Sequence, residues 1–406
     1  MRFSVTGSIK GERVRKFPLM GKTMRKTLCL SLLLPFLLIP ACSFFPEKAF
    51  QSRSESAICL PGFPDQDGWY GGDGAYSIRL DDRRVLWLFG DTFVSDQPGR
   101  QDRADMKVVW GTTLAVSTCT ANAKFQIRYF IKKKNGQFVS FFGDKEWLWP
   151  QDPFIVDHKL YVPLISVKAN PEIKGPFQFE VIGHKFARIN NFEGADPQQW
   201  IIDEIDLTPG IPDGIKAFAT TSVVHGGYVY FYPLYGSTKD GVSILGNILA
   251  RIPADKLGSP AGAIEYLTRN GQWEKKLDPA SVKVVLNAAV SELSVRYHQD
   301  DGKWIAVYMS LRNNGDQMLY QTASSLEGPW AEPKVLIAQI PEVDRTSPRY
   351  DKNNFCYAGK EHPEFARGRK LVVTYVCNSF EDLEKNTSFI RKNLFLYRPV
   401  VQSPLH

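Results

Sequence analysis

The sequence predicts an all-β fold, and three observations together favour a five-bladed β-propeller. Helical periodicity is scarce, short apolar or aromatic strands recur between Gly, Asp, Asn and Pro turns, and paired strands repeat at a nearly constant spacing. A radial array of four-stranded units is the plan of a propeller. Two packed β-sandwiches are the alternative, but they do not require even spacing.

Five predicted hairpins define the repeat. Their second strands begin near residues 84, 159, 228, 303 and 370, so that the spacing lies between 67 and 75 residues. The paired strands are "AYSIRL" with "RVLWLFG", "PFIVDH" with "KLYVPLI", "TSVVHG" with "YVYFYPLYG", "LSVRYHQ" with "KWIAVYMS", and "PEFARG" with "KLVVTYV". The first strand of a propeller blade lines the central channel, so a site is expected where these first strands begin.

The N-terminal segment predicts export and a lipid anchor. "MRKTLCLSLLLPFLLIPACS" starts at Met24 with two cations, continues with a short apolar run and ends in Ala41-Cys42, which is typical of a secretory signal. Cys42 after a small residue resembles a bacterial lipobox, and Ser43 resembles the choice for outer-membrane sorting. The alternative is an ordinary signal with a chance cysteine. We expect a signal peptide at 1–41 with its true start at Met24, a lipidated linker at 42–59, one propeller domain at 60–400 and a tail at 401–406.

The charge distribution argues against nucleic-acid binding. Residues 1–41 hold eight Lys or Arg and one Glu, whereas the remainder holds 42 Lys or Arg and 42 Asp or Glu. A neutral body has no field that attracts phosphates. The membrane contact is therefore expected to come from the lipid on Cys42 alone.

Four cysteines remain after the predicted lipidation site: Cys59, Cys119, Cys356 and Cys377. An even number of cysteines in an exported protein permits disulfides. Cys356 and Cys377 flank the last predicted hairpin and could be cross-strand neighbours or buried thiols. No CxxC or HExxH pattern predicts a metal site, and no cofactor is expected. A structural calcium or sodium ion in the central channel stays an open alternative.

Acidic or imidazole side chains stand at four of the five predicted strand entries. A single acidic loop residue means little, but the same kind of residue at one level of four blades indicates a site. These residues are Asp73, Asp152, Glu292 and the group Glu361, His362 and Glu364, while the third repeat presents Thr220 and Thr221.

Asp73 and Asp91 are the strongest catalytic candidates from the residues alone. They stand nine residues before and nine after the hairpin centre at Asp82, so they should lie opposite each other at one end of the first blade. Facing carboxylates are unfavourable unless one holds a proton or both bind something. An acid paired with a carboxylate is what glycosidic bond cleavage uses. The alternative is that both residues cap turns.

Tryptophans near the acidic strand ends could stack on sugar rings, although tryptophan also packs between blades. Trp69, beside Asp67 and glycines, is the favoured stacking residue, and Trp110 is a second. Trp147 and Trp149 also lie close to the acidic strand ends or their connecting loops. His362 could contact a ligand or be a satisfied histidine at a strand end.

The motifs "GGDGAYSI…LWLFGDTF", "WPQDPFIV…LYVPLI" and "EHPEF…LVVTYVCNS" resemble the five-bladed propeller family once catalogued as domain of unknown function 4185. That resemblance implies an endo-acting arabinan hydrolase, similar in architecture to the arabinanase and xylosidase clan of glycosidases. By the resemblance, Asp73 and Asp91 are catalytic, and Asp152 and Glu292 orient sugar or adjust a pKa. Thr220 and Thr221 depart from the three-acid scheme of that clan.

The sequence thus predicts an exported, lipid-anchored glycoside hydrolase that acts on a neutral furanosyl polysaccharide or oligosaccharide. Substrate contacts are expected from Asp152, Glu292, Glu361, His362, Trp69 and Trp110. A non-catalytic sugar-binding propeller and a scaffold lipoprotein are the alternatives. A binding module needs no closely spaced acids, and a scaffold needs no acidic funnel.

Overall fold

The computed structural model describes residues 59–143, 146–175, 177–239, 242–383 and 385–406 of the chain. The chain divides into two compact units, Met1–Ser54 and Glu55–His406, and every described residue belongs to the second unit. The predicted signal peptide and Cys42 lie outside the described residues. Within the described part, no helix has the length and apolar character needed to cross a bilayer.

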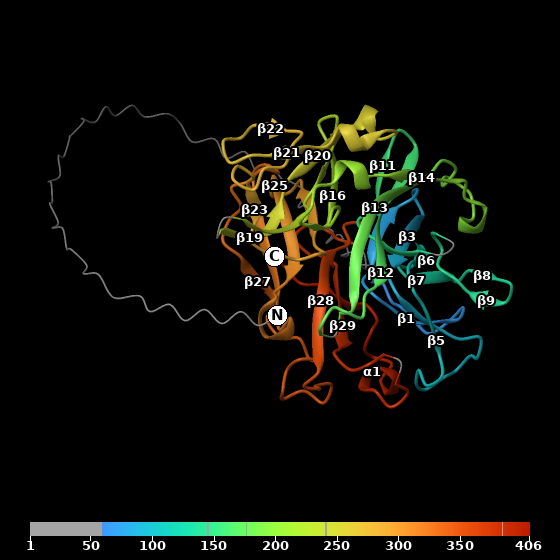
Figure 1. Ribbon diagram of the computed structural model, residues 1–406. Coiled ribbons are helices and arrows are strands. Elements are labelled where there is room, and N and C mark those ends of the chain that lie inside the picture. The colour runs from blue at the N-terminus through green and yellow to red at the C-terminus, as the bar shows by residue number, and fades with distance from the viewer. Residues whose placement is uncertain (1–58, 144–145, 176, 240–241, 384) are drawn as a thin grey trace, which may run out of the picture. The chain divides into compact units, whose positions relative to one another are not determined.

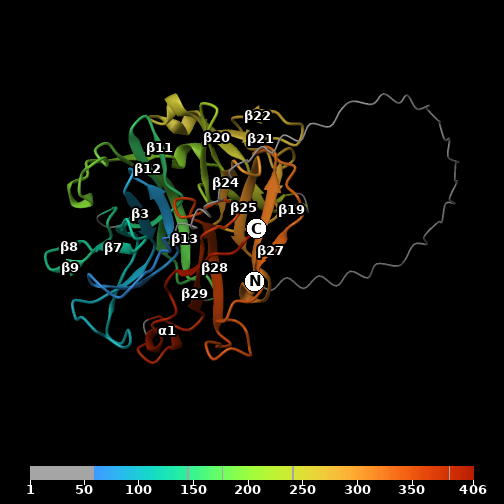
Figure 2. The ribbon, with the colours of Figure 1, turned by 180° about the vertical axis from the view of Figure 1, so that it is seen from behind.

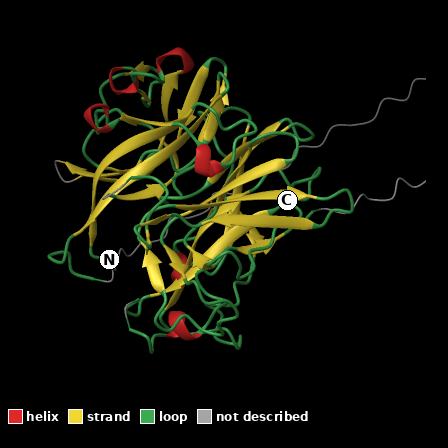
Figure 3. Ribbon diagram, turned by 90° about the vertical axis from the view of Figure 1, so that its right-hand side faces the viewer, coloured by secondary structure: helices red, strands yellow, loops and turns green. Residues whose placement is uncertain are grey.

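The described residues are nearly all in strands and loops (Figure 3). The helices are α1 (Phe389–Lys392) and the 3₁₀ turns Pro197–Gln199, Thr208–Gly210, Ala254–Lys256, Pro260–Gly262 and Arg312–Asn314, each of three or four residues. This composition confirms the all-β prediction.

Five antiparallel sheets carry the predicted repeat (Figures 1 and 2). The first contains β2 (Tyr76–Arg79), β3 (Arg84–Phe89), β6 (Thr113–Cys119) and β7 (Phe125–Phe130). The second contains β10 (Trp147–Pro150), β11 (Phe154–Val156), β12 (Lys159–Ala169), β13 (Phe179–Ile189) and β14 (Ile202–Asp206). The third contains β16 (Ser222–His225), β17 (Tyr228–Phe231), β20 (Ala250–Pro253), β21 (Glu265–Leu267) and β22 (Trp273–Glu274).

The last two repeat sheets and three smaller sheets complete the architecture. The fourth repeat sheet contains β24 (Ser294–His298), β25 (Lys303–Met309), β26 (Met318–Ala323) and β27 (Lys334–Ile337), and the fifth contains β28 (Asn354–Glu361), β29 (Val373–Ser379) and β30 (Val400–Gln402). The smaller sheets are formed by β1 (Trp69–Gly72), β4 (Thr92–Val94) and β5 (Lys107–Val109), by β15 (Ile215–Ala217), β18 (Leu234–Lys239), β19 (Val242–Ile248) and β23 (Val284–Leu286), and by β8 (Lys133–Lys134) with β9 (Gln137–Phe138).

Apolar packing between neighbouring repeat sheets closes them into a ring. One buried cluster joins the first and second sheets, another joins the second and third, and the series continues to a cluster between the fifth and the first. Representative cross-sheet sets are Leu88 with Leu160, Phe186 with Phe231, Tyr230 with Trp304, Val307 with Val373, and Trp87 with Val401. Because each sheet buries both faces against its neighbours, the fold is a β-propeller.

The predicted strand starts are right in four repeats and wrong in the fifth. Strands β3, β12, β17 and β25 begin at Arg84, Lys159, Tyr228 and Lys303, as predicted. In the fifth repeat the first strand is β28, not "PEFARG", which forms the turn after it. A break in register around Ala358 and Gly359 disrupts the alternation that would have marked β28. The number of blades stays a prediction of five. The sheets β1-β4-β5 and β15-β18-β19-β23 extend two of the hairpins, so the repeat sheets do not account for all the strands.

Arg103 fastens the first part of the domain to the last. Its fully buried guanidinium donates to five backbone carbonyls, those of Tyr70, Ile390, Asn393, Leu394 and Leu396. All five N–H donors of a guanidinium are thereby satisfied without a carboxylate partner. Burial is the main cause that lowers the pKa of Arg103, to about 9.

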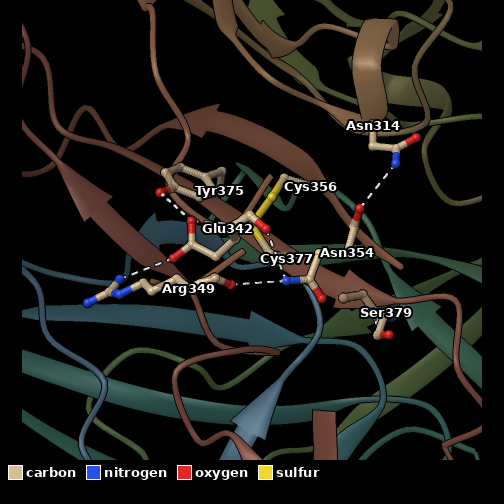
Figure 4. The surroundings of a disulfide bond; sticks show 9 residues. Asn314, Glu342, Arg349, Asn354, Cys356, Tyr375, Cys377 and Ser379 are labelled. Carbon is tan, nitrogen blue, oxygen red and sulfur yellow. Dashed lines mark hydrogen bonds and ion pairs between the residues drawn. A yellow bond between two sulfur atoms is a disulfide. The ribbon is translucent and has the colours of Figure 1, made fainter. Parts of the chain in front are cut away.

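Two disulfides join Cys59 to Cys119 and Cys356 to Cys377. The second links directly paired residues of β28 and β29, so the cross-strand alternative is confirmed. Figure 4 shows it beside the buried Glu342, whose carboxylate accepts from Tyr375 Oη at 3.2 Å and pairs with Arg349 at 3.1 Å. Asn354 Nδ2 donates to the backbone oxygens of Glu342 and Arg349, whereas Asn354 Oδ1 is buried without a hydrogen-bond partner.

Candidate active site

Asp73 and Asp91 lie where one long hairpin is interrupted. Strand β1 pairs with β4 and β2 pairs with β3, so the same two chain segments pair on both sides of the interruption. Asp73 N donates to Asp91 O at 2.9 Å, and Gly90 N donates to Asp73 O at 2.8 Å. The structure therefore confirms that Asp73 and Asp91 are opposed. The register is the same on both sides, since Gly72 pairs with Thr92 and Tyr76 pairs with Leu88.

A large cleft opens over this interruption. Its volume is about 1320 Å³, and residues from each of the five repeats line it. Of the predicted site residues, Asp73, Asp91, Glu292 and Trp110 line the cleft. Seven Asp or Glu residues and one Lys are found among its described lining residues, so the cleft is acidic.

Asp91 is almost completely buried, with 5% of its surface exposed. Its Oδ1 accepts hydrogen bonds from Gly111 N and Trp149 Nε1, both at 2.8 Å. Burial raises the pKa of Asp91 to about 7, although both N–H donors act to lower it. Because both donors point at one oxygen, they fix the carboxylate and favour its charged form.

Asp73 is partly exposed to the cleft, and its Oδ1 lies 2.5 Å from the hydroxyl of Tyr357. Loss of hydration is the first cause that raises the pKa of Asp73 to about 8, and the nearby charge of Glu292 is the second. The Tyr357 hydroxyl and the Lys360 charge oppose that shift. Burial and the Glu292 charge thus favour the protonated form of Asp73, whereas two N–H donors favour the charged form of Asp91.

Glu292, which lies just before β24, adds a third carboxyl residue to Asp73 and Asp91 in the site. Its Oε1 lies 2.7 Å from Lys360 Nζ, and that ammonium group lies 4.0 Å from the ring centroid of Tyr76. Lys360 is nearly fully buried, whereas Glu292 keeps 19% of its side chain exposed. The pair thus places a positive charge beside Glu292, while Glu292 still lines the cleft.

Gly74 allows Glu292 to approach Asp73. Its φ is +58°, a conformation that side chains rarely adopt, and a Cβ there would lie 2.8 Å from Glu292 Oε1. Gly111 has a similar role beside Asp91, because its φ is +116° and a Cβ would meet Ser140 Oγ at 2.6 Å. Both glycines are therefore required by conformation and by space.

The aromatic residues divide into cleft walls and core. Trp110 stacks on Trp147 with ring centroids 4.8 Å apart, and both line the cleft, as does Trp149. Trp69, in contrast, is fully buried and stacks on Tyr129 at 4.6 Å. The expectation that Trp69 contacts a sugar is corrected: its ring fills the core beside the first sheet.

Asp152, Glu361 and His362 do not line the cleft. Asp152 is 1% exposed, and its carboxylate pairs with Arg296 at 2.8 Å and accepts from Thr221 Oγ1 and Ser222 N. His362 lies between Ser77 and Thr374, each 2.7 Å away, and burial holds its pKa well below the usual value. Because β28 starts earlier than predicted, Glu361 and His362 fall at the far end of this first strand. Substrate contact by these three residues is corrected to a structural role.

Sequence reasoning missed Tyr357, Lys360 and His184. Tyr357 contacts Asp73 and Lys360 contacts Glu292, in the place where Glu361 and His362 were expected. The signal was the polar tyrosine–lysine pair in "NFCYAGKE", just before the predicted hairpin. His184 lines the cleft from β13, and burial lowers its pKa to about 4, so its ring is neutral at pH 7.

The fold and site define the chain as a β-propeller with a carboxyl-lined cleft. The family described as "domain of unknown function (DUF5005)" matches residues 63–401, so the chain belongs to that family. The resemblance of the sequence motifs to domain of unknown function 4185 stays a prediction. No curated protein matches the chain.

Several solved structures are similar to the chain at low sequence identity. A candidate hydrolase from Bacteroides ovatus ATCC 8483 is similar with a TM-score of 0.58 and 17% identity, over 83% of this chain and 86% of that chain. A GH43_1 enzyme from Xanthomonas citri, complexed with xylotriose, has a TM-score of 0.39 and 12% identity over 79% and 84%. An exo-β-1,3-galactanase from Phanerochaete chrysosporium has a TM-score of 0.42 and 10% identity over 75% of this chain and 56% of its own length.

Proposed function

We propose that this protein is a glycoside hydrolase. The observation that carries the proposal is the opposed pair Asp73 and Asp91, which share one cleft but have different surroundings. One carboxyl has a pKa raised to about 8 and the other to about 7. Two carboxyl groups whose environments separate their pKa values are the parts that glycosidic cleavage requires.

The surroundings assign a role to each residue. Asp73, the weaker acid, gives its proton to the leaving oxygen as the glycosidic carbon–oxygen bond breaks. Asp91, held as a carboxylate by Gly111 N and Trp149 Nε1, attacks the sugar carbon or removes a proton from the attacking water. Water supplies the hydroxyl and the proton that appear in the two products. Glu292 supports the acid, because its negative charge helps Asp73 to keep its proton.

The cleft favours a neutral sugar chain over an anionic one. Its volume exceeds the range of about 300–1,000 Å³ that single small ligands usually occupy. The stacked Trp110 and Trp147 and the half-exposed Phe177 and Phe380 offer apolar faces for sugar rings. Seven acidic side chains in the lining would repel uronic acids. A furanosyl polymer such as arabinan is the finer proposal, and it rests on the resemblance of the sequence motifs.

The test is a panel of neutral and acidic polysaccharides, including D- and L-arabinan, with reducing ends measured after incubation. We expect release from a neutral polymer by the parent and none by Asp73→Asn or Asp91→Asn. Asp82→Asn, at the tip of the same hairpin, is the matched control and should retain activity. Binding without release by the parent would favour the sugar-binding alternative, and cleavage confined to uronic-acid polymers would contradict the proposal.

We further propose that the protein is exported and anchored in the outer membrane through lipid on Cys42. The support is the signal-like segment that ends in Ile39-Pro40-Ala41-Cys42. Intact-mass measurement of the membrane-extracted protein should show acyl mass on the parent and none after Cys42→Ser. A parent without acyl mass would contradict the anchor and leave the hydrolase proposal unaffected.

A further inference from the structure

A second group of polar side chains lies at the opposite end of the fourth repeat from the cleft. Glu292 precedes β24, and His298 ends it, so about 20 Å of strand separates them at about 3.3 Å per residue. His298, Asp301 in the β24–β25 turn, and His406 have potential ligand atoms that all lie within 4.8 Å of one another. The hydrolase proposal uses none of these three residues.

Three different chain segments bring the group together. His298 and Asp301 belong to the β24–β25 hairpin, and the adjoining Glu361 ends β28. His406 comes from the segment after β30, which lies beside the turn following β28 through a bridge between Lys370 and Leu405. Figures 1 and 2 both place the C-terminus beside β25. A ligand at this point would hold these segments together.

The hydrogen bonds of His406 leave one ring nitrogen directed at the group. Its Nδ1 lies 2.8 Å from the backbone oxygen of Arg369, which can only accept, so Nδ1 carries a hydrogen. Its Nε2 lies 2.7 Å from Asp301 Oδ2. A neutral ring would set a lone pair against a carboxylate oxygen at that distance, so either a second proton or a cation must lie there.

His298 has the same arrangement with a different partner. Its Nε2 lies 3.0 Å from Glu361 Oε2, and the Glu361 side chain is fully buried. The other oxygen of that carboxylate, Oε1, is buried without a hydrogen-bond partner. A histidine held on one nitrogen by a carboxylate or a carbonyl is the usual setting of a metal ligand. Here both histidines have such a partner.

We propose that His298, Asp301 and His406 bind a divalent zinc-class ion, with Glu361 as the carboxylate that positions His298. Two imidazoles and a carboxylate are the ligand types that zinc takes in proteins. Ligand atoms at about 2.0–2.2 Å from one tetrahedral ion lie about 3.4 Å apart. Binding therefore requires Asp301 Oδ2 and His406 Nε2, which lie 2.7 Å apart, to separate so that the ion can enter between them. The His298 and His406 side chains are 10% and 5% exposed, which fits a structural ion that ties the C-terminal segment to the fourth and fifth sheets.

Zinc binding to the full chain, after dialysis against a chelator, tests this site. Calorimetric titration with Zn²⁺ and metal analysis should give one equivalent that His406→Ala and Asp301→Asn remove. Glu361→Gln should weaken binding about 10- to 100-fold without abolishing it, as expected for a positioning residue. His158→Ala is the matched control, because His158 makes a 3.0 Å pair with Glu193 on the surface and belongs to no group of three potential metal ligands among the described residues.

Thermal unfolding with and without Zn²⁺ supplies a second readout. The parent should gain stability from zinc, and the His406→Ala variant should not, whatever its stability without metal. Absence of a stoichiometric zinc, zinc binding unchanged by His406→Ala and Asp301→Asn, or preference for Ca²⁺ over Zn²⁺ would each overturn the proposal. None of these results depends on whether the cleft hydrolyses a sugar.

Discussion

The buried Lys360 ammonium lies 2.7 Å from Oε1 of Glu292, a carboxylate that lines the cleft. Lys360 thereby holds Glu292 in place and also acts on Asp73, because its positive charge lowers the pKa that burial and Glu292 raise. A lysine from the fifth sheet and a glutamate from the fourth thus jointly set the proton affinity of an aspartate in the first.

Replacing Lys360 by Met should raise the pKa of Asp73 further, since an opposing positive charge is lost. The alkaline limb of the pH–activity profile should then move to higher pH, while activity falls because Glu292 loses its partner. The profile on a cleaved substrate is the measurement. Lys185→Met, which removes a surface lysine paired with Glu146 and Glu204, is the control and should leave both limbs in place.

The two active carboxyls predict a narrow bell-shaped pH profile. Activity needs Asp91 ionised, which requires a pH above its pKa of about 7, and Asp73 protonated, which requires a pH below its pKa of about 8. We therefore expect an optimum between these values and a decline on both sides. A maximum below pH 5 would contradict the roles assigned to the pair.

Trp149→Phe should affect only the acidic limb of that profile. The substitution keeps an aromatic wall but removes the N–H donor 2.8 Å from Asp91 Oδ1, a donor that lowers the pKa of Asp91. The acidic limb should shift to higher pH. Trp147→Phe is the matched control from the same strand, because Trp147 lines the cleft without a hydrogen bond to Asp91 in the described contacts. Equal shifts in both variants would argue against the donor role.

Asp73→Asn should make the protein more stable at pH 8 while it abolishes hydrolysis. A carboxyl whose pKa rises on folding binds its proton more tightly in the folded state, so the free energy of unfolding falls as pH rises from about 4 to about 8. Asparagine removes that loss, and we expect a gain of at least about 1 kcal/mol at pH 8 that vanishes near pH 4. Urea unfolding at both pH values measures it.

The matched control for this stability change is Asp81→Asn at the hairpin tip. The pKa of Asp81 is lowered, because N–H groups of Arg83 and Arg84 outweigh the opposing effect of its burial. Its stabilising effect is present above the unfolded pKa and is lost as pH falls, so its substitution should reduce stability at pH 8. The two variants should therefore change stability in opposite directions.

Arg296→Met should destabilise the fold by about 3 kcal/mol, because the buried Asp152 would lose its cationic partner and keep only the donors Thr221 Oγ1 and Ser222 N. The double variant Arg296→Met/Asp152→Asn should recover much of the loss. Arg188→Met removes an exposed pair with Asp203 and should cost less than about 1 kcal/mol. An unchanged free energy of unfolding, with a raised KM instead, would return Asp152 to the substrate-binding residues.

The sequence predicts most of the fold because continuous apolar second strands such as "RVLWLFG" and "KWIAVYMS" stand out from their turns. It also predicts the opposition of Asp73 and Asp91, since both are counted from one short turn. Trp69 could not be separated from cleft tryptophans, because neighbouring glycines occur equally beside a core residue. Lys360 was hidden by the irregular pairing of β28, where a bulge after Tyr357 changes which side chains point into the channel.

The five acceptors of Arg103 are carbonyl oxygens, which every amino acid carries. Residues 390, 393, 394 and 396 can therefore change identity during evolution without loss of this link, provided that the local chain path survives. Position 103 has no such freedom, since lysine offers three donors from a single point and methionine offers none. Substitutions in the C-terminal segment are thus compatible with an intact link between the first and last parts of the domain. The link requires a particular side chain at position 103 alone.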